Sequence, residues 1–176
     1  ARPRGAPSGF GPVELASAYD MTPLQNAGLR GQNQSIALFE LDGFQQSDVV
    51  QYFQQYGLGT PNITTIPVNH FNGASGQGAI EVELDLEIVG AIAPQANMLV
   101  YEGPGTVAGI NAIYNKIVSD HKARIAEISW GLCEASTGNA EIQTLHTIFK
   151  TGALQGMTFV AASGDAGGGA IARGHR

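Results

Sequence analysis

Short runs of apolar and β-branched residues alternate, for most of the chain, with longer segments whose apolar residues recur at helical spacing. The short runs, typical of buried strands, lie at 35–41, 63–68, 97–102, 124–130 and 156–163. The helical patterns lie at 47–57, 79–93, 107–121 and 140–153. This alternation predicts a doubly wound α/β fold, in which helices cover both faces of a mostly parallel sheet. Ligands in such sheets bind at the carboxyl ends of the strands.

The segment 79–93 places two carboxyl groups on the apolar face of its predicted helix. At about 100° per residue, Glu81 and Asp85 fall on the same side. Their neighbours on that side are Leu84, Ile88, Val89 and Ile92, and the opposite side gathers Glu83, Glu87 and Gly90. Only the second acidic pair is therefore expected to be solvated.

The cost of ionising two neighbouring carboxyl groups at a buried position points to chemistry at this helix. One member of the pair Glu81 and Asp85 would keep its proton while the other acts as a base, which suits catalysis at acid pH. The alternative without catalysis is an amphipathic helix whose acids reach a buried arginine or a helix N-terminus.

Acidic and aromatic side chains also stand at the ends of other predicted strands. Glu40 ends the first strand, Trp130 closes the fourth and Asp165 follows the fifth. Each has an ordinary explanation, namely a solvated loop residue, a core or pocket-wall side chain, and an Asx turn, respectively. Their shared position is more informative than any one of them, because an α/β sheet presents side chains at this edge to its active site.

Composition excludes several other classes of protein. The chain has 176 residues, of which 43% are hydrophobic and 14% charged. This composition predicts one folded unit with a substantial core. A net charge of −6, with no run of Lys or Arg, argues against a nucleic-acid partner. No apolar stretch approaches the roughly 18 residues of a membrane span. Cys133 is the only cysteine, so neither an intrachain disulfide nor a cysteine-based metal site is possible.

Two short patterns bear weakly on location. Asn33 and Asn62 each begin an Asn-X-Ser/Thr glycosylation pattern, which often arises by chance but is compatible with secretion. The first residues contain no apolar signal core, so any export signal is expected to have been removed.

Four segments stand in an informative order and spacing. They are FELDG (39–43), EVELDLEIVGAIAP (81–94), EISWG (127–131) and VAASGDAG (160–167). Together they resemble the sedolisins, the serine-carboxyl peptidases, and FGPVELASAYDMTPL near the start is similar to the first helix of the mature sedolisin catalytic domain. The resemblance extends over nearly all 176 residues. It implies a subtilisin-like fold and a secreted endopeptidase that hydrolyses peptide or protein substrates in acid.

The resemblance also implies roles for individual residues. Glu81 would be the general base toward a nucleophilic serine, Asp85 would support it, and Asp165 would donate a hydrogen bond from a protonated carboxyl to the oxyanion. Glu40 and Trp130 would extend the hydrogen-bond network. The substrate-binding positions would be Ser129, Trp130, Gly131, Ser163 and Gly164.

The sequence departs from the family pattern at the nucleophile. Sedolisins carry the serine in a Gly-Thr-Ser-Ala segment well beyond the loop of Asp165, and a calcium loop later still, and these 176 residues contain neither. The chain is therefore expected to be the N-terminal part of one catalytic domain, inactive alone and without calcium ligands. Either a nick in the glycine-rich loop after Asp165 left a second chain, or a segment is missing. The nick is favoured because half a sheet would expose its core and an unpaired edge.

Three alternative functions are open to the chain. A histidine-based subtilisin is disfavoured because Glu81 occupies the helix where its histidine would act. The loop 103–109 resembles a dinucleotide-binding turn with altered spacing, although a tight turn with Thr106 as helix N-cap also explains it. A peptidase-like scaffold that binds peptides without cutting them is the third, because the chain has no serine in the nucleophile's context.

Overall fold

The computed structural model describes residues 10–165, except for the side chain of Ala135, and this part of the chain contains a five-stranded sheet. The strands are β1 (Ser35–Glu40), β2 (Asn62–Pro67), β3 (Asn97–Glu102), β4 (Ile125–Ile128) and β5 (Thr158–Ala161). Their spatial order is β2-β3-β1-β4-β5, and these neighbours pair in parallel. Each strand falls on a predicted run, so the parallel sheet is confirmed.

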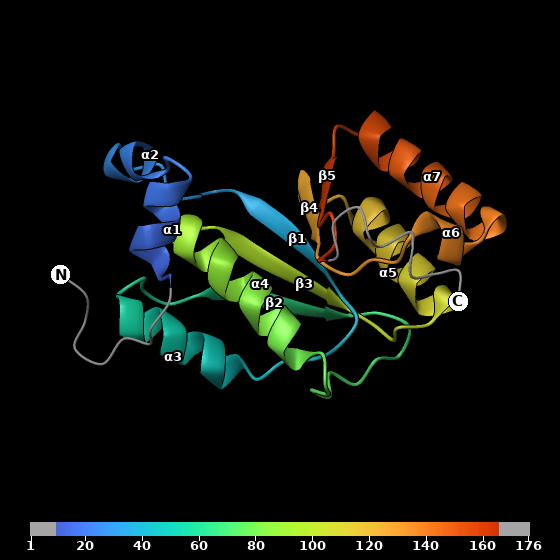
Figure 1. The fold of residues 1–176 in the computed structure, drawn as a ribbon, viewed down its shortest axis with the longest axis horizontal. Helices are drawn as coiled ribbons and strands as arrows, with labels where there is room; N and C mark the ends of the chain where they lie inside the picture. Colours follow the sequence, from blue (N-terminus) through green and yellow to red (C-terminus); the bar gives the residue numbers. More distant parts are fainter. Residues whose placement is uncertain (1–9, 166–176) are drawn as a thin grey trace.

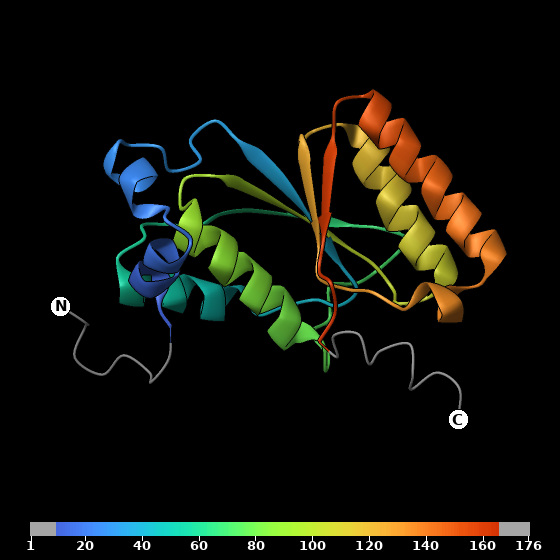
Figure 2. The same ribbon diagram turned by 45° about the horizontal axis from the view of Figure 1, so that its top comes forward.

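Helices cover both faces of this sheet (Figures 1 and 2). One face carries α3 (Gln46–Tyr56) and α4 (Ala79–Ile92), with α1 (Pro12–Ala18) and α2 (Thr22–Asn26) near the end of α4. The other carries α5 (Val107–Asp120) and α7 (Asn139–Leu154), with the short α6 (Glu134–Thr137) between them in sequence. The four predicted helices and the doubly wound architecture are confirmed. None of the helices described is long and apolar enough to cross a membrane.

Two hydrophobic cores, one on each face of the sheet, hold the layers together. Strand β1 contributes to both, because successive side chains of a strand point to opposite faces. Leu38 belongs to the core beneath α3 and α4, whereas Ala37 and Phe39 belong to the core beneath α5 and α7. Phe39 stacks on Tyr114 of α5 with ring centroids 4.2 Å apart. Burial on both faces is why the sequence of β1 is a continuous apolar run.

The orientation of α4 differs from the helical-wheel prediction. Its buried positions are Val82, Leu86, Gly90 and Ala91. Leu84 and Ile88, which the wheel placed on the core face, are 47% and 39% exposed. Glu83 and Glu87, predicted to be solvated, are partly buried, and Glu83 accepts a hydrogen bond from the backbone N–H of Gln45 at 3.0 Å. The division into one buried and one solvated acidic pair was therefore wrong.

The physical reason for this difference is a close approach between α3 and α4. A Cβ atom at Gly90 would lie 2.1 Å from the ring of Phe53 on α3, so glycine lets that ring pack against the helix backbone. This contact turns Val82 and Leu86 inward. Asp85 consequently lies at the edge of the buried stripe instead of at its centre.

The glycine-containing loop before α5 is a tight turn. Thr106 accepts a hydrogen bond from the Gly109 amide at 3.1 Å, which confirms it as the N-cap of α5. A Cβ atom at Gly109 would lie 2.0 Å from the Pro104 carbonyl oxygen. Local packing therefore explains the glycines that resemble a dinucleotide-binding turn.

Candidate active site

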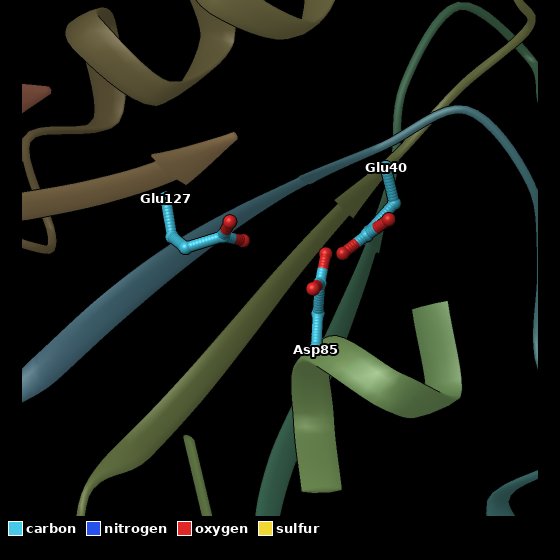
Figure 3. Close-up of side chains that lie close together, drawn as sticks. All are labelled: Glu40, Asp85 and Glu127. Carbon is cyan, nitrogen blue, oxygen red and sulfur yellow. The ribbon is translucent and has the colours of Figure 1, made fainter. Parts of the chain in front are cut away.

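Acidic side chains gather where the carboxyl ends of β1 and β4 approach α4 (Figure 3). Glu40 ends β1, Glu127 lies within β4 and Asp85 projects from α4, and one oxygen of each lies within 4.8 Å of the others. Figure 3 shows the Glu40 and Asp85 carboxyl groups pointing toward each other. These three acids, together with Ser129 and Trp130, are called the carboxyl cluster below.

Glu40 is the most deeply buried acid of the cluster, with 0% of its surface exposed. The indole Nε1 of Trp130 donates a hydrogen bond to its Oε2 at 2.8 Å, whereas its Oε1 has no partner among the residues described. Burial raises the pKa of Glu40 to about 9, against the lowering effect of the Trp130 bond, and nearby Asp85 and Glu127 raise it further. Glu40 therefore keeps its proton in acid and at neutral pH.

Asp85 is held by the hydroxyl of Ser129, whose Oγ lies 2.9 Å from Asp85 Oδ1. Burial raises the pKa of Asp85 to about 6, while the Ser129 bond lowers it and the charge of Glu81 raises it. Asp85 can thus change its protonation state in mildly acidic solution.

Sequence reasoning missed Glu127, the third acid of the carboxyl cluster. Its Oε1 lies 2.8 Å from the same Ser129 Oγ. Burial raises the pKa of Glu127 to about 7, and the charge of Asp85 adds to this effect. One signal could have identified it: an ionisable residue inside an apolar strand, two positions before Ser129 and therefore on the same face.

A hydrogen-bonded clamp at Asp42 fixes the start of α4. The Asp42 carboxylate accepts hydrogen bonds from the backbone amides of Gly43, Gly76 and Gly78, at 2.8, 2.8 and 2.7 Å. Gly78 is the N-cap of α4, and Glu81 follows in the first turn, partly exposed and one helical turn before Asp85. The clamp therefore sets the position from which Glu81 projects.

The other predicted site residues lie on the surface. Gly131 follows β4 and is exposed, and so are Ser163, Gly164 and Asp165 after β5. Because β4 and β5 are parallel neighbours, both loops leave the sheet at the edge where Glu40 ends β1. The structure thus joins Glu40, Asp85, Ser129 and Trp130 by hydrogen bonds or close approach, and places the exposed positions at the same edge.

A resident cation does not fit the carboxyl cluster. Calcium needs six to eight oxygen ligands and favours ionised carboxylates. Glu40 holds its proton, and Trp130 and Ser129 already bond to three of the six carboxyl oxygens of the cluster. Among the residues described, these three acids are the only His, Cys, Asp or Glu side chains that gather closely enough, in a group of three or more, to share a metal ion. That calcium ligands lie elsewhere stays a prediction.

Comparison with known proteins gives a consistent set of relatives, although no family model matches the chain. Kumamolisin from Bacillus sp. (strain MN-32) is 38% identical over 173 residues, which cover 92% of this chain and 30% of kumamolisin. Sedolisin from Pseudomonas sp. (strain 101) is 30% identical over 174 residues, 93% of this chain and 29% of that protein. Human tripeptidyl-peptidase 1 is 25% identical over 166 residues, 92% of this chain and 30% of that protein.

Among solved structures, the chain is similar to Pseudomonas sedolisin, described as a serine-carboxyl proteinase, in complex with two molecules of pseudo-iodotyrostatin. The TM-score is 0.80 at 26% identity, and the match covers 96% of this chain and 48% of that one. This similarity confirms the α/β fold class. The chain spans about half of that structure and 29–30% of the three relatives named above.

Proposed function

The chain belongs to the sedolisin family, and on this premise we propose that residues 1–176 are the N-terminal part of the catalytic domain of an acid-acting serine endopeptidase. The observation that carries the proposal is the carboxyl cluster. Asp85, hydrogen-bonded to Ser129 at 2.9 Å, lies one helical turn after Glu81 and beside the buried pair of Glu40 and Trp130. Buried, partly protonated acids around one helix suit proton transfer in acid.

In this proposal Glu81 is the general base. It accepts the proton of a serine hydroxyl as that oxygen attacks the peptide carbonyl, and later returns the proton to the leaving amine. Asp85 supports Glu81 and stabilises it as it becomes neutral. Glu40, bonded to Trp130, packs beside Asp85 and helps to position it. Because Glu40 keeps its own proton, it does not add a further negative charge next to Asp85.

Asp165 has a different proposed role, on the other side of the substrate. Its carboxylic acid donates a hydrogen bond to the oxyanion of the tetrahedral intermediate, which requires Asp165 to be protonated. The backbone of Ser163 and Gly164 beside it, and that of Ser129 to Gly131 at the end of β4, would bind the extended peptide by strand-like hydrogen bonds.

The serine is proposed to come from outside these 176 residues, either from a second chain or from a further segment. The chain alone is then inactive. A denaturing gel of the active protein tests the two-chain version: it requires a band near 18.3 kDa together with a companion chain. A single longer chain with full activity would contradict it. Calcium bound by the remainder of the domain, and a secreted location, are further proposals from the family.

The alternative function is a peptidase-like scaffold that binds peptides without hydrolysing them. Binding of a peptide without turnover by the complete protein would establish it. A nucleotide-binding role has no structural support, since packing around Thr106 and Gly109 explains that loop.

Replacing the proposed base tests the function. In the complete protein, Glu81→Gln is expected to lower kcat on a denatured protein substrate by roughly 10²–10⁴-fold, the usual contribution of a positioned general base. The assay is run at about pH 4, near the ordinary pKa of carboxyl groups. Activity should be blocked by a peptide aldehyde, and not by pepstatin or by chelators of zinc.

The matched control is Glu83→Gln. Glu83 lies two residues after Glu81 on the same helix, and its side chain accepts a hydrogen bond from the backbone N–H of Gln45. This variant should retain activity, because Glu83, unlike Glu81, does not interact with Asp85, Glu40 or Glu127. Full activity in Glu81→Gln would refute the assignment of the base.

A further inference from the structure

The hydrogen-bond geometry of Ser129 fixes a proton in the carboxyl cluster. Ser129 Oγ lies 2.9 Å from Asp85 Oδ1 and 2.8 Å from Glu127 Oε1. A hydroxyl has one hydrogen and can donate to only one of these carboxyl groups. The second contact is a hydrogen bond only if the other carboxyl is protonated and donates to Ser129. One of Asp85 and Glu127 therefore carries a proton in this geometry.

The surroundings of Glu127 favour its protonated form over that of Asp85. The titratable groups that interact with Glu127 from the packed elements are Glu40 on β1, Asp85 and Glu81 on α4, and Tyr114 on α5. All are acids or a phenol, so none stabilises a negative charge on Glu127. Burial raises the pKa of both groups. The hydrogen bond with Asp85 raises the pKa of Glu127 further, whereas the bonds with Ser129, Glu40 and Glu127 lower the pKa of Asp85, which agrees with the proton residing on Glu127.

An independent feature also indicates shared protons in the cluster. Glu40 is fully buried, yet its Oε1 has no hydrogen-bond partner among the residues described, and its carboxyl points toward Asp85 (Figure 3). A protonated Glu40 can direct its hydrogen at Asp85. Asp85 would then receive hydrogen bonds from two sides, which favours its ionised form.

We propose that Glu127 is a positioning residue for the catalytic acids: its carboxylic acid donates to Ser129 Oγ, and Ser129 donates to the Asp85 carboxylate. This relay of two protons and three groups fixes the rotamer of Asp85, and through it the neighbouring Glu81. The inference rests on the proposed function and gives Glu127 a role within the carboxyl cluster, in which it acts through Ser129 and does not touch the substrate.

The relay has a direct consequence for pH dependence. When Glu127 loses its proton, two carboxylates compete for the single hydrogen of Ser129, and one contact becomes repulsive. Both hydrogen bonds of Ser129, and with them the position of Asp85, are therefore intact in acid. They are lost as the pH rises through the pKa of Glu127, about 7. A glutamine at this position would keep a donor at every pH.

The first test measures kcat and KM across pH in the complete protein. Glu127→Ala should lower kcat by roughly tenfold, the equivalent of one hydrogen bond, with KM little changed. Glu127→Gln should restore most of that loss and move the alkaline limb of the kcat profile to higher pH. Glu141→Gln, which alters an acid bonded to Asn111 on the other side of the sheet, is the control and should leave the profile in place. An alkaline limb that is identical in Glu127→Gln and the parent overturns the proposal.

A second test needs no peptidase activity, so it separates failure of this inference from failure of the proposed function. A carboxyl group whose pKa is higher in the folded than in the unfolded state stabilises the fold at a pH below its unfolded-state pKa. That contribution is lost as the pH rises through its folded-state pKa. The parent should therefore lose Tm between pH 4.5 and about 7, and Glu127→Gln should lose less over the same range. Equal losses overturn the proposal. A Tm increase on adding calcium that disappears in Glu127→Gln would also overturn it, because the cluster would then hold a cation.

Discussion

At the scale of single residues, Trp130 links the candidate chemistry to the packing of the molecule. Its ring packs against both hydrophobic cores, and its Nε1 donates to Glu40, ninety residues earlier in the chain. The bond from Trp130 is the one hydrogen bond that Glu40 Oε2 accepts among the residues described. The position of the indole and the protonation of the buried acid are therefore coupled.

Removing the indole donor should expose this dependence. Trp130→Phe is expected to lower the free energy of unfolding by about 1–3 kcal/mol, because it leaves the buried Oε2 of Glu40 without its hydrogen-bond donor. It should also raise the pKa of Glu40 further, since the Trp130 bond is what lowers it. Urea unfolding of the complete protein measures the first effect. Combining Trp130→Phe with Glu40→Gln should give strongly non-additive changes, and a coupling below about 0.5 kcal/mol would contradict the link.

Individual site residues differed in how far the sequence could predict them. Glu40 and Trp130 stand at strand ends, where an α/β sheet exposes side chains to its active edge, so position alone made them candidates. Glu127 has apolar neighbours on both sides within β4, and only the arrival of α4 from a distant segment gives it a function. Sequence spacing contains no information about that approach.

At the scale of elements, α4 shows why a helical wheel can fail. Apolar residues occur on nearly every side of this helix, including Ile80, which is 77% exposed, and Leu84, which is 47% exposed. Periodicity therefore does not distinguish the core face from the others. Which face of α4 is buried is determined by the close packing of Gly90 against the Phe53 ring.

Filling that contact should destabilise the protein even though alanine is the better helix former. Gly90→Ala gains up to about 1 kcal/mol of helix propensity but places a Cβ 2.1 Å from the Phe53 ring, and overpacking of this kind costs about 1–3 kcal/mol. A lower urea midpoint is expected. Gly105→Ala is the control, because the nearest atoms to its Cβ lie 4.0 Å away on Leu41. A Gly90→Ala protein more stable than the parent would disprove this account of how α4 is oriented.

At the scale of the whole molecule, the raised carboxyl pKa values make stability depend on pH. Burial raises the pKa of Glu87 and Asp85 to about 6, of Glu127 to about 7 and of Glu40 to about 9. The pKa of each of these groups is higher in the folded than in the unfolded state. Their stabilisation of the fold is therefore present at a pH below the unfolded-state pKa and disappears as the pH rises through the folded-state pKa.

The complete protein should therefore be more stable at about pH 4 than at about pH 8, by at least roughly 2 kcal/mol, since one pKa unit corresponds to about 1.4 kcal/mol. Urea unfolding at the two pH values measures this difference. Glu40→Gln should reduce it more than Glu83→Gln does. Equal stability at both pH values would mean that these acids are not buried in the protein.

The fold of the molecule was more predictable than its site. Strands such as β1 and β3 are buried on both faces, so residues 36–39 and 98–101 form unbroken apolar runs, and the positions of these strands follow from that local pattern. The order of the strands does not follow in the same way. It depends on which distant segments pair, and β1 lies between β3 and β4 because of packing that no local pattern records.

The central position of β1 has a consequence for how the protein is made. Its partners are β3 and β4, and the register that joins Ile36 to Ile125 cannot form until the later strand has left the ribosome. Contacts this far apart in sequence form slowly, because a long loop must close before they can stabilise anything. The carboxyl cluster contains residues of both β1 and β4, so a nascent chain in which these strands have not yet paired does not contain the cluster. Slow long-range pairing thus delays assembly of the proposed proteolytic machinery until most of the sheet exists.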